Sequence, residues 1–167
     1  MSLKFRQRRL IWCTVSTSSA SSTISFYICD GLHRLEGHEM QYLTHIDCAT
    51  LTFMTQGNFR YVDTTGQQGI LAAGGVEWMK AGNGVWHSGT PVGDTQVKGF
   101  QLWIALPAAE ENTPAQSIYL APSDVPQEGP ARALRGRYGE AKSPINALAQ
   151  MTYLSVSMRR SQCLNFC

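Results

Sequence analysis

The sequence contains few charged residues and no long hydrophobic run. Charged residues make up 16% of the 167 positions, against roughly 25% in an average globular protein. No apolar stretch approaches the roughly 20 residues that a membrane-spanning helix needs, so no membrane association is expected. The five cysteines form no CxxC pair and no regular spacing, which argues against a disulfide scaffold or a zinc site. We therefore predict a cytoplasmic protein.

Helical periodicity is also scarce, whereas turn residues are common. The chain contains 15 glycines and 7 prolines, and its apolar residues fall in short segments that are typical of antiparallel sheets. The segments predicted as strands before the proline-rich part are 24–28, 50–55, 59–63, 70–72, 76–79, 84–87 and 99–106. An extended proline-rich connector is predicted over 107–130, followed by strands over 131–138 and 151–158. The sequence therefore predicts an all-β protein.

The net charge of +2 conceals an uneven distribution. Six of the 14 basic residues lie near the two ends of the chain: Lys4, Arg6, Arg8, Arg9, Arg159 and Arg160. The remaining eight are outnumbered by 12 acidic residues, so the body of the chain is acidic. Because a nucleic-acid-binding protein needs a basic face on its folded body to contact phosphates, we expect no nucleic-acid partner.

Several motifs in order carry a resemblance to a known family. Residues 78–88 read WMKAGNGVWHS and resemble the WMxAGxGxxHSE signature of the pirin family, which belongs to the cupin superfamily. Residues 98–107 (KGFQLWIALP) are similar to that family's GxQLWVxLP strand, and residues 45–53 (HIDCATLTF) are similar to the HIGLATVTY segment of many bacterial members. The resemblance extends over residues 37–156, and residues 139–145 (GEAKSPI) resemble the segment that opens a second cupin half.

The resemblance implies a cupin-type antiparallel β-barrel, also described as a double-stranded β-helix or jelly roll, with a metal site inside it. In the family, an HxH pair and a later HxE pair supply three imidazoles and one carboxylate. Alternate residues of a strand point the same way, so both members of each pair can face the interior. Such a ligand set suits ferrous iron. The resemblance implies an iron site, with quercetin 2,3-dioxygenase activity or a role in transcriptional co-regulation.

Two of the four implied ligand positions are changed in this chain. The first position of the HxH pair is Leu43, which leaves His45, and the carboxylate position of the HxE pair is Gly89, which leaves His87. Neither leucine nor glycine can bind a metal through its side chain. Two interpretations stay open. Either the two histidines hold a weakly bound divalent metal, iron by resemblance, with water completing its coordination, or they are metal-free interior residues that form hydrogen bonds.

Other candidate residues fit the implied site less well. Glu77 occupies a position that the family fills with an amide, so it is a poor substitute ligand. Cys48 lies an odd number of residues after the HxH pair, which places it on the opposite face of a continuous strand. His33 and His38 lie outside the family's ligand positions, and their acidic neighbours predict a solvated loop. Tryptophans are predicted to pack in the core or at its rim, although Trp86 could also line the mouth of a pocket: Trp78, Trp86 and Trp103.

The length matches about one half of the two-half family that the chain resembles. We predict an atypical N-terminal segment over 1–23, a pirin-like cupin barrel over 24–120, and a connector with the truncated start of a second half over 121–167. This arrangement is expected of a degenerate member or of a disrupted reading frame. The C-terminal strands would then have an exposed edge, which predicts a homodimer. A small-molecule ligand in the barrel is the other predicted partner.

These observations support two functions. The first is a pirin-like cupin protein with a degenerate metal site and a binding or regulatory role, with no catalytic residue and no firmly bound cofactor. The second is a weak metal-dependent dioxygenase of the quercetin 2,3-dioxygenase type that uses His45 and His87. The two missing ligands favour the first function.

Overall fold

The computed structural model describes residues 8–15, 27–30, 42–94, 96–146 and 151–158. These residues form antiparallel β-strands and a four-residue helix, α1 (Ala108–Glu111), so the all-β prediction is confirmed. No helix in these ranges is long and apolar enough to cross a membrane. The chain divides into two compact units, one over 21–124 and the other formed by 1–20 together with 125–167. The two units are defined by contacts within the chain. The domain bounds inferred from the sequence therefore stay a prediction.

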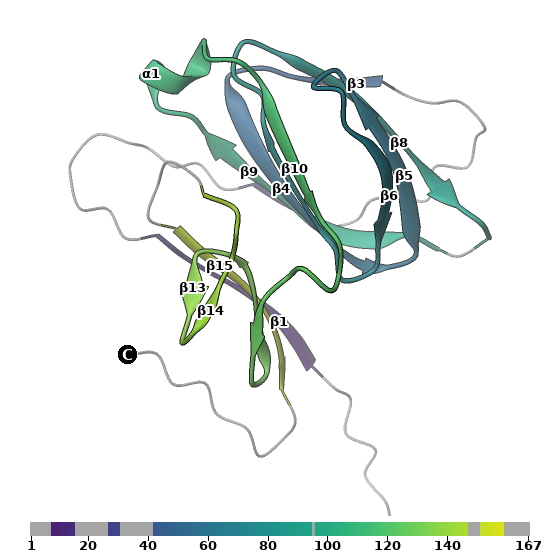
Figure 1. Ribbon diagram of the computed structural model, residues 1–167, viewed down its shortest axis with the longest axis vertical. Helices are drawn as coiled ribbons and strands as arrows, with labels where there is room; N and C mark the ends of the chain where they lie inside the picture. Colours follow the sequence, from purple (N-terminus) through teal and green to yellow (C-terminus); the bar gives the residue numbers. More distant parts are fainter. Residues whose placement is uncertain (1–7, 16–26, 31–41, 95, 147–150, 159–167) are drawn as a thin grey trace, which may run out of the picture. The chain divides into compact units, whose positions relative to one another are not determined.

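Two antiparallel sheets face each other within the unit over 21–124 (Figure 1). The larger sheet contains, in spatial order, β10 (Gln116–Leu120), β7 (Val76–Lys80), β4 (Cys48–Gln56), β9 (Lys98–Ala105) and β2 (Tyr27–Asp30). The smaller sheet contains β3 (Tyr42–His45), β8 (Val85–Val92), β5 (Asn58–Asp63) and β6 (Gln68–Ala72). Each strand predicted between residues 50 and 106 is present. The described strands form two facing sheets that are not closed into one hydrogen-bonded barrel.

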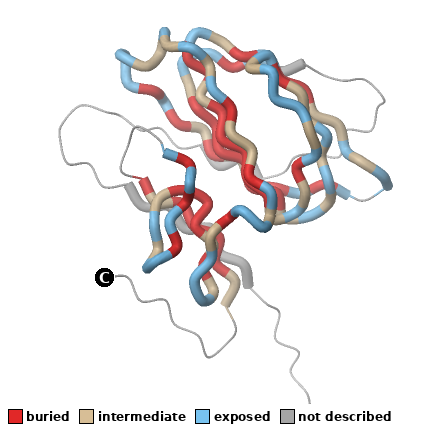
Figure 2. Tube along the Cα trace, viewed as in Figure 1, coloured by how far each residue is buried: buried red, intermediate tan, exposed pale blue. Residues whose placement is uncertain are grey.

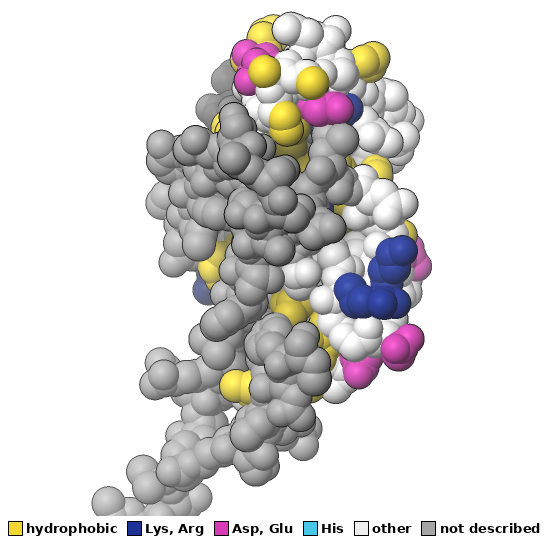
Figure 3. Space-filling model, turned by 90° about the vertical axis from the view of Figure 1, so that its left-hand side faces the viewer, with side chains coloured by type: hydrophobic (Ala, Val, Ile, Leu, Met, Phe, Trp, Pro, Cys, Tyr) yellow, Lys and Arg dark blue, Asp and Glu magenta, His cyan; other side chains and the backbone are white. Residues whose placement is uncertain are grey.

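The core of this unit lies between the two sheets (Figure 2). Six consecutive residues of β4 are buried, so this strand is covered on both faces. On its inner face, Met54 packs with Leu71 of β6 and with Val97. The rings of Phe59 and Tyr61, from β5, pack against the same cluster. Both described histidines are buried as well, and no histidine side chain is visible on the face drawn in Figure 3. The interior between the sheets is therefore where the implied metal site must be sought.

The stretch that we predicted as an extended connector over 107–130 contains regular structure. Residues Gln116–Leu120 form β10, which pairs with β7 along all five of its residues. Pro114 and Pro122 flank this strand and do not interrupt it, so its N–H groups remain available for the ladder. The connector prediction is wrong here because the proline content of the whole stretch masks a short segment with buried residues at its second and fifth positions.

The second unit contains a four-stranded sheet and a two-stranded one. The larger sheet contains, in spatial order, β1 (Arg8–Val15), β15 (Met151–Met158), β12 (Ala131–Arg135) and β11 (Gln127–Glu128). The smaller contains β13 (Arg137–Tyr138) and β14 (Ala141–Lys142). β15 pairs with β1 on one edge and with β12 on the other. This differs from the open C-terminal edge that we expected, and a homodimer stays a prediction.

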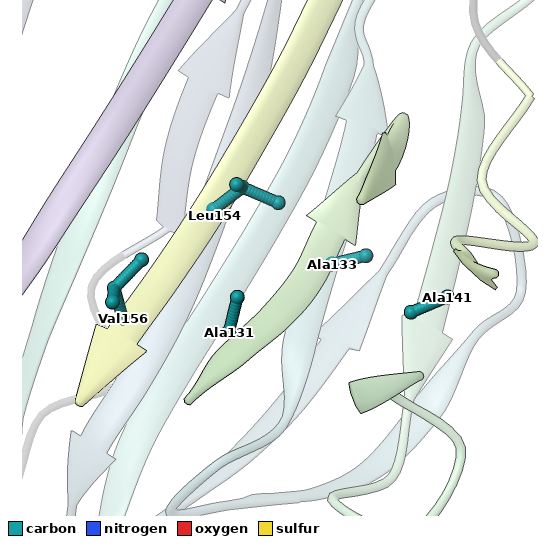
Figure 4. Packing of buried hydrophobic residues seen from close by; sticks show 5 residues of the cluster. All are labelled: Ala131, Ala133, Ala141, Leu154 and Val156. Carbon is teal, nitrogen blue, oxygen red and sulfur yellow. The ribbon is translucent and has the colours of Figure 1, made fainter. Parts of the chain in front are cut away.

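A cluster with three small side chains forms part of the core of the second unit. Three alanines pack with Leu154 and Val156 of β15, as Figure 4 shows: Ala131, Ala133 and Ala141. All five of these residues are buried, and four of them are fully buried. Because the alanine side chains are small, the space between them and the two larger residues of β15 is filled by few atoms. This unit therefore has an apolar core of its own.

Candidate functional site

The pairing of β3 with β8 brings the two predicted histidines together. Leu43 lies opposite His87, and His45 lies opposite Val85. Residues opposite each other, and residues two apart on one strand, share a face of the sheet. The imidazoles of His45 and His87 are diagonal neighbours on the inner face, with ring centres 4.8 Å apart and planes tilted by 44°. Both side chains are buried.

Most of the imidazole nitrogens at this site have no hydrogen-bond partner among the described residues. Both ring nitrogens of His45 and Nε2 of His87 are buried and unpaired. Burial, followed by the neighbouring charge of His87, lowers the pKa of His45 from its ordinary value to about 4. His45 is therefore a neutral ring at physiological pH, with one N–H and one lone pair to offer. Buried polar atoms without partners are costly, and they mark a place where a bound atom would be stabilised.

Aromatic packing holds His45 from the larger sheet. The ring of Trp103, on β9, meets the imidazole edge to face with ring centres 4.5 Å apart. Trp103 Nε1 donates to Gln101 Oε1 at 2.9 Å, and Gln101 Nε2 donates to Thr52 Oγ1 at 3.2 Å. The indole N–H of Trp103 thus donates to Gln101 and not to the imidazole of His45. Trp103 has the packing role that its sequence context predicts.

The fourth implied ligand position is filled by an aromatic ring. Gly89 on β8 lies opposite Tyr61 on β5, so Phe59, two residues from Tyr61, is its diagonal neighbour on the inner face. A Cβ atom built on Gly89 would overlap the ring of Phe59. A side chain at residue 89 is therefore excluded by the position of Phe59 as well as by the identity of the glycine.

A buried acidic network lies beside His87. The hydroxyl of Tyr119, on β10, is 2.9 Å from Asp63 Oδ2 and 3.0 Å from Glu77 Oε1. The other oxygen of Asp63 accepts hydrogen bonds from the backbone N–H of Thr65 at 2.8 Å and from its hydroxyl at 2.6 Å. Glu77 Oε1 lies 3.9 Å from His87 Nδ1. The tyrosine hydroxyl thus links a carboxylate of the smaller sheet to a carboxylate of the larger one.

Electrostatics keeps Tyr119 protonated and Asp63 ionised. Burial, together with the charges of Glu77 and Asp63, raises the pKa of Tyr119 far above its ordinary value. Burial alone would raise the pKa of Asp63, but hydrogen bonds from Thr65 and Tyr119 outweigh it and hold that pKa below its usual range. The phenol of Tyr61 stacks on that of Tyr119 with ring centres 3.6 Å apart. The network is therefore a hydrogen-bonded and stacked part of the interior.

The remaining sequence candidates lie elsewhere or outside the described residues. Cys48 packs against the buried cluster of Met79, Ala81 and Val85, and burial raises the pKa of its thiol. Trp86 is 54% exposed, on the face of β8 opposite to that of His87. His33 and His38 lie outside the described residues. Neither Cys48 nor Trp86 joins the two imidazoles.

A hollow of about 640 Å³ lies on the other face of the smaller sheet. Strand alternation separates its outward-facing residues from the inward-facing histidines. Residues of β5, β6 and β8 line it, and neither histidine is among them: Arg60, Tyr61, Val62, Gln68, Gly69, Ile70, Ser88 and Thr90. This hollow is therefore distinct from the site that the sequence predicts.

Comparison with known proteins identifies the family. The profile of the pirin family matches residues 15–104, more than half of the chain. The chain belongs to the pirin family. A pirin-like protein of Caulobacter vibrioides is 45% identical over 65 residues, which are 38% of this chain and 24% of that protein. Pirin-1 of Arabidopsis thaliana is 30% identical over 119 residues, which are 69% of this chain and 41% of that protein.

The fold agrees with the same family. The crystal structure of quercetin 2,3-dioxygenase from Acinetobacter baumannii matches with a TM-score of 0.58 and 30% identity, over 64% of this chain and 37% of that chain. The predicted cupin-type β fold is thus confirmed. The chain spans less than half of the length of the family members named here.

The pirin-type iron centre can be tested against the residues present. Two imidazoles on one ion, with bonds of about 2.1 Å, place their ring centres about 5 Å apart, and the separation between His45 and His87 is 4.8 Å. The unpaired nitrogens also suit a metal. No group of three or more His, Cys, Asp or Glu side chains within the described ranges is arranged to hold one. The two histidines fit a weakly held ion, and the site does not fit a four-ligand iron centre.

Three residues of this site were not found by sequence reasoning. Phe59, Asp63 and Tyr119 lie on β5 and β10, outside the ligand motifs of the pirin family. The sequence signal for Phe59 and Asp63 was the alternation of β5, which places residues 59, 61 and 63 on one face. Nothing in the local sequence indicates that Tyr119 reaches both carboxylates, because that contact depends on how two sheets face each other.

Proposed function

We propose that this chain is a pirin-family cupin protein with a binding or regulatory role that no longer carries out metal-dependent oxygenation. The observation that carries this proposal is the overlap of the Phe59 ring with the space of a side chain at Gly89. The ring takes the space in which such a side chain would begin. Residue 89 therefore cannot carry a side-chain ligand while Phe59 keeps its present position.

The second lost position strengthens the same argument. Leu43 lies opposite His87 on the neighbouring strand, where the resemblance places an imidazole. Each tenfold loss of affinity corresponds to about 1.4 kcal/mol, so the loss of two ligands worth a few kcal/mol each lowers metal affinity by several orders of magnitude. A ligand in the barrel would then be held by packing and hydrogen bonds, with the unpaired imidazole nitrogens as its polar contacts.

Metal content and oxygen uptake test this proposal together. Protein purified from cells supplied with iron is measured for metal per chain, and its oxygen consumption is followed with quercetin. The quercetin 2,3-dioxygenase from Acinetobacter baumannii serves as the positive control. We expect metal far below one ion per chain and no uptake above buffer. Stoichiometric iron that disappears in the His87→Ala variant would overturn the proposal.

A second candidate function is a weak metal-dependent dioxygenase of the quercetin type. It is favoured by the unpaired nitrogens of His45 and His87 and by their ring separation of 4.8 Å. For this function, added ferrous iron should produce oxygen uptake that is lost in both His45→Ala and His87→Ala. The exposed position Gln68 offers a matched control, because Gln68→Ala leaves the interior unchanged. Iron-independent background uptake in all variants would eliminate this candidate.

A small-molecule ligand in the barrel is the binding partner that we propose. Quercetin is the probe, because the similar solved structure carries that substrate in its name. Isothermal titration should detect binding without turnover. A variant with a bulkier inner face, Thr50→Phe on β4, should abolish it, because Thr50 lies opposite Trp103, whose ring contacts His45. Gln68→Ala should leave binding unchanged. Equal binding by both variants would place the ligand outside the barrel.

A further inference from the structure

The hydroxyl of Tyr119 has two carboxylate neighbours and only one proton. It can donate to Asp63 or to Glu77, but not to both at once. Asp63 already accepts two hydrogen bonds from Thr65 on its other oxygen and is held as an anion. Whenever Tyr119 donates to Asp63, Glu77 needs another donor, because a buried carboxylate without one is costly. Glu77 is buried, with 6% of its surface exposed.

The imidazole of His87 is a donor within reach of Glu77. Its Nδ1 atom lies 3.9 Å from Glu77 Oε1, which is within ion-pair distance but longer than a hydrogen bond of about 2.7–3.2 Å. The two atoms must therefore move closer for Glu77 to accept the Nδ1–H. The other ring nitrogen, Nε2, is buried and has no partner among the described residues. The two nitrogens of this ring therefore have different surroundings. Nδ1 faces a carboxylate, whereas Nε2 faces the interior and has no hydrogen-bond partner there.

We propose that Glu77 is a positioning residue for His87, whose Nδ1–H it accepts. This fixes the neutral tautomer that carries its proton on Nδ1 and leaves the lone pair on Nε2. Carboxylates behind histidines set ring orientation and tautomer in this way. Tyr119 and Asp63 position Glu77 in turn. The inference deepens the proposed function, since it assigns to the binding centre a lone pair that accepts a metal ion or a hydrogen-bond donor.

The role of Glu77 differs from that of the carboxylate ligand that this chain lacks at residue 89. It projects from β7 of the larger sheet, whereas Gly89 lies on β8 of the smaller sheet. Its Oε1 atom also lies 3.0 Å from the Tyr119 hydroxyl. It therefore supports the imidazole on its Nδ1 side and does not replace the missing ligand on its Nε2 side.

The tautomer of His87 can be measured directly in metal-free protein. Protein labelled with ¹⁵N in histidine is treated with a chelator and studied by long-range ¹H–¹⁵N correlation NMR at pH 7.5. His87→Asn identifies the signals of this ring. We expect a protonated, pyrrole-type Nδ1 and an unprotonated, pyridine-type Nε2. A proton on Nε2 in the unsubstituted protein overturns the proposal, whatever the variants do.

Two substitutions at residue 77 separate positioning from packing. Glu77→Met removes the acceptor but retains the volume, and it should shift His87 to a mixture of tautomers. Glu77→Gln keeps a carbonyl acceptor, and it should retain the Nδ1–H form. Thr50→Val is the matched control, because Thr50 is also buried on the inner face of β4 and its hydroxyl has no hydrogen-bond partner among the described residues; it should leave the tautomer unchanged. An unchanged tautomer in Glu77→Met contradicts the role of Glu77.

The proposed function fails independently of this inference. Metal content and oxygen uptake are measured on the unsubstituted protein as purified, whereas the tautomer is measured after metal removal. Stoichiometric iron with a protonated Nδ1 would overturn the proposed function and support the role of Glu77. Absence of metal with a protonated Nε2 would do the reverse.

Discussion

The ring of Phe59 occupies the space in which a side chain on Gly89 would begin. The two residues come from adjacent strands, β5 and β8, and face the same interior. Glycine at residue 89 is therefore a condition for the aromatic ring at residue 59 in its present position. The glycine at the former carboxylate position and the packing of the Phe59 ring therefore depend on each other.

This relationship predicts strong coupling between the two positions. Gly89→Ala alone should lower the free energy of unfolding by about 1–3 kcal/mol, because the added methyl forces the ring to move. In a Phe59→Ala background the same substitution should be neutral or slightly stabilising, since glycine inside a strand is unfavourable. Urea denaturation of the four proteins gives the coupling energy. Equal effects of Gly89→Ala in both backgrounds would contradict the packing described here.

Metal binding should return only when the interior is opened as well. The variant Leu43→His/Gly89→Glu/Phe59→Ala restores the ligand types at both changed positions and removes the ring. We expect close to one metal ion per chain by elemental analysis, with a higher melting temperature in the presence of ferrous iron. The same variant with Phe59 retained should bind far less metal. Equal metal content in the two variants would show that Phe59 does not block the site.

The buried imidazole of His45 predicts an acid-sensitive fold. Its pKa is lowered to about 4 in the folded chain, whereas an unfolded histidine has a pKa of about 6.5. Between these values the unfolded chain binds a proton that the folded chain does not, so stability falls as the pH decreases. At 1.36 kcal/mol per pKa unit, this contribution amounts to about 3 kcal/mol by pH 4.

Denaturation of the protein and of a His45→Leu variant between pH 7 and pH 4.5 checks this dependence. The variant lacks the titrating ring, so its stability should fall less over this range than that of the unsubstituted chain. Parallel curves for the two proteins would assign the acid sensitivity to other groups.

Tyr119 predicts a loss of stability at alkaline pH. Its pKa is raised in the folded chain, so above a pH of about 10 the unfolded chain ionises this phenol while the folded chain does not. Stability should therefore fall as the pH rises beyond that value. Absorbance of tyrosinate near 295 nm should reveal a phenol that ionises only when the protein unfolds. In Tyr119→Phe this delayed step should be absent.

The same substitution should destabilise the protein at neutral pH. Removal of the hydroxyl leaves Asp63 and Glu77 without a shared donor in a buried environment, at a cost of about 1–3 kcal/mol. Thermal denaturation of Tyr119→Phe beside Tyr61→Phe, the partly buried tyrosine that stacks on it, measures the difference. A smaller loss for Tyr119→Phe than for Tyr61→Phe would contradict the network.

The sequence was most informative where structure depends on neighbouring residues. Turns between strands could be located because glycine is needed in them: Gly57 and Gly66 separate β4, β5 and β6 and have φ angles of 76° and 90°. The alternation of β5 also indicated its buried face. By contrast, β1 could not be recognised, because its partner β15 lies at the other end of the sequence and the segment itself carries no turn signal.

The candidate site was predictable to the same extent. His45 and His87 could be named because they lie within motifs whose spacing is fixed along single strands. The ring of Phe59 over Gly89 depends on the register of β5 with β8, and the contact of Tyr119 with Glu77 depends on the pairing of β10 with β7. Such contacts join residues that are distant in sequence, and a single sequence contains no record of the register.

The pairing of β1 with β15 also sets an order of events in folding. Arg8 pairs with Met158 and Val15 with Met151, so nearly the whole chain lies between the two strands. During synthesis the residues of β1 leave the ribosome long before a partner exists, and contacts of such large sequence separation form slowly. The β5–β6 hairpin can form before β1 has a partner. The slowest step in maturation should therefore be the pairing of β1 with β15, and a chaperone that binds exposed strands would have its longest opportunity there.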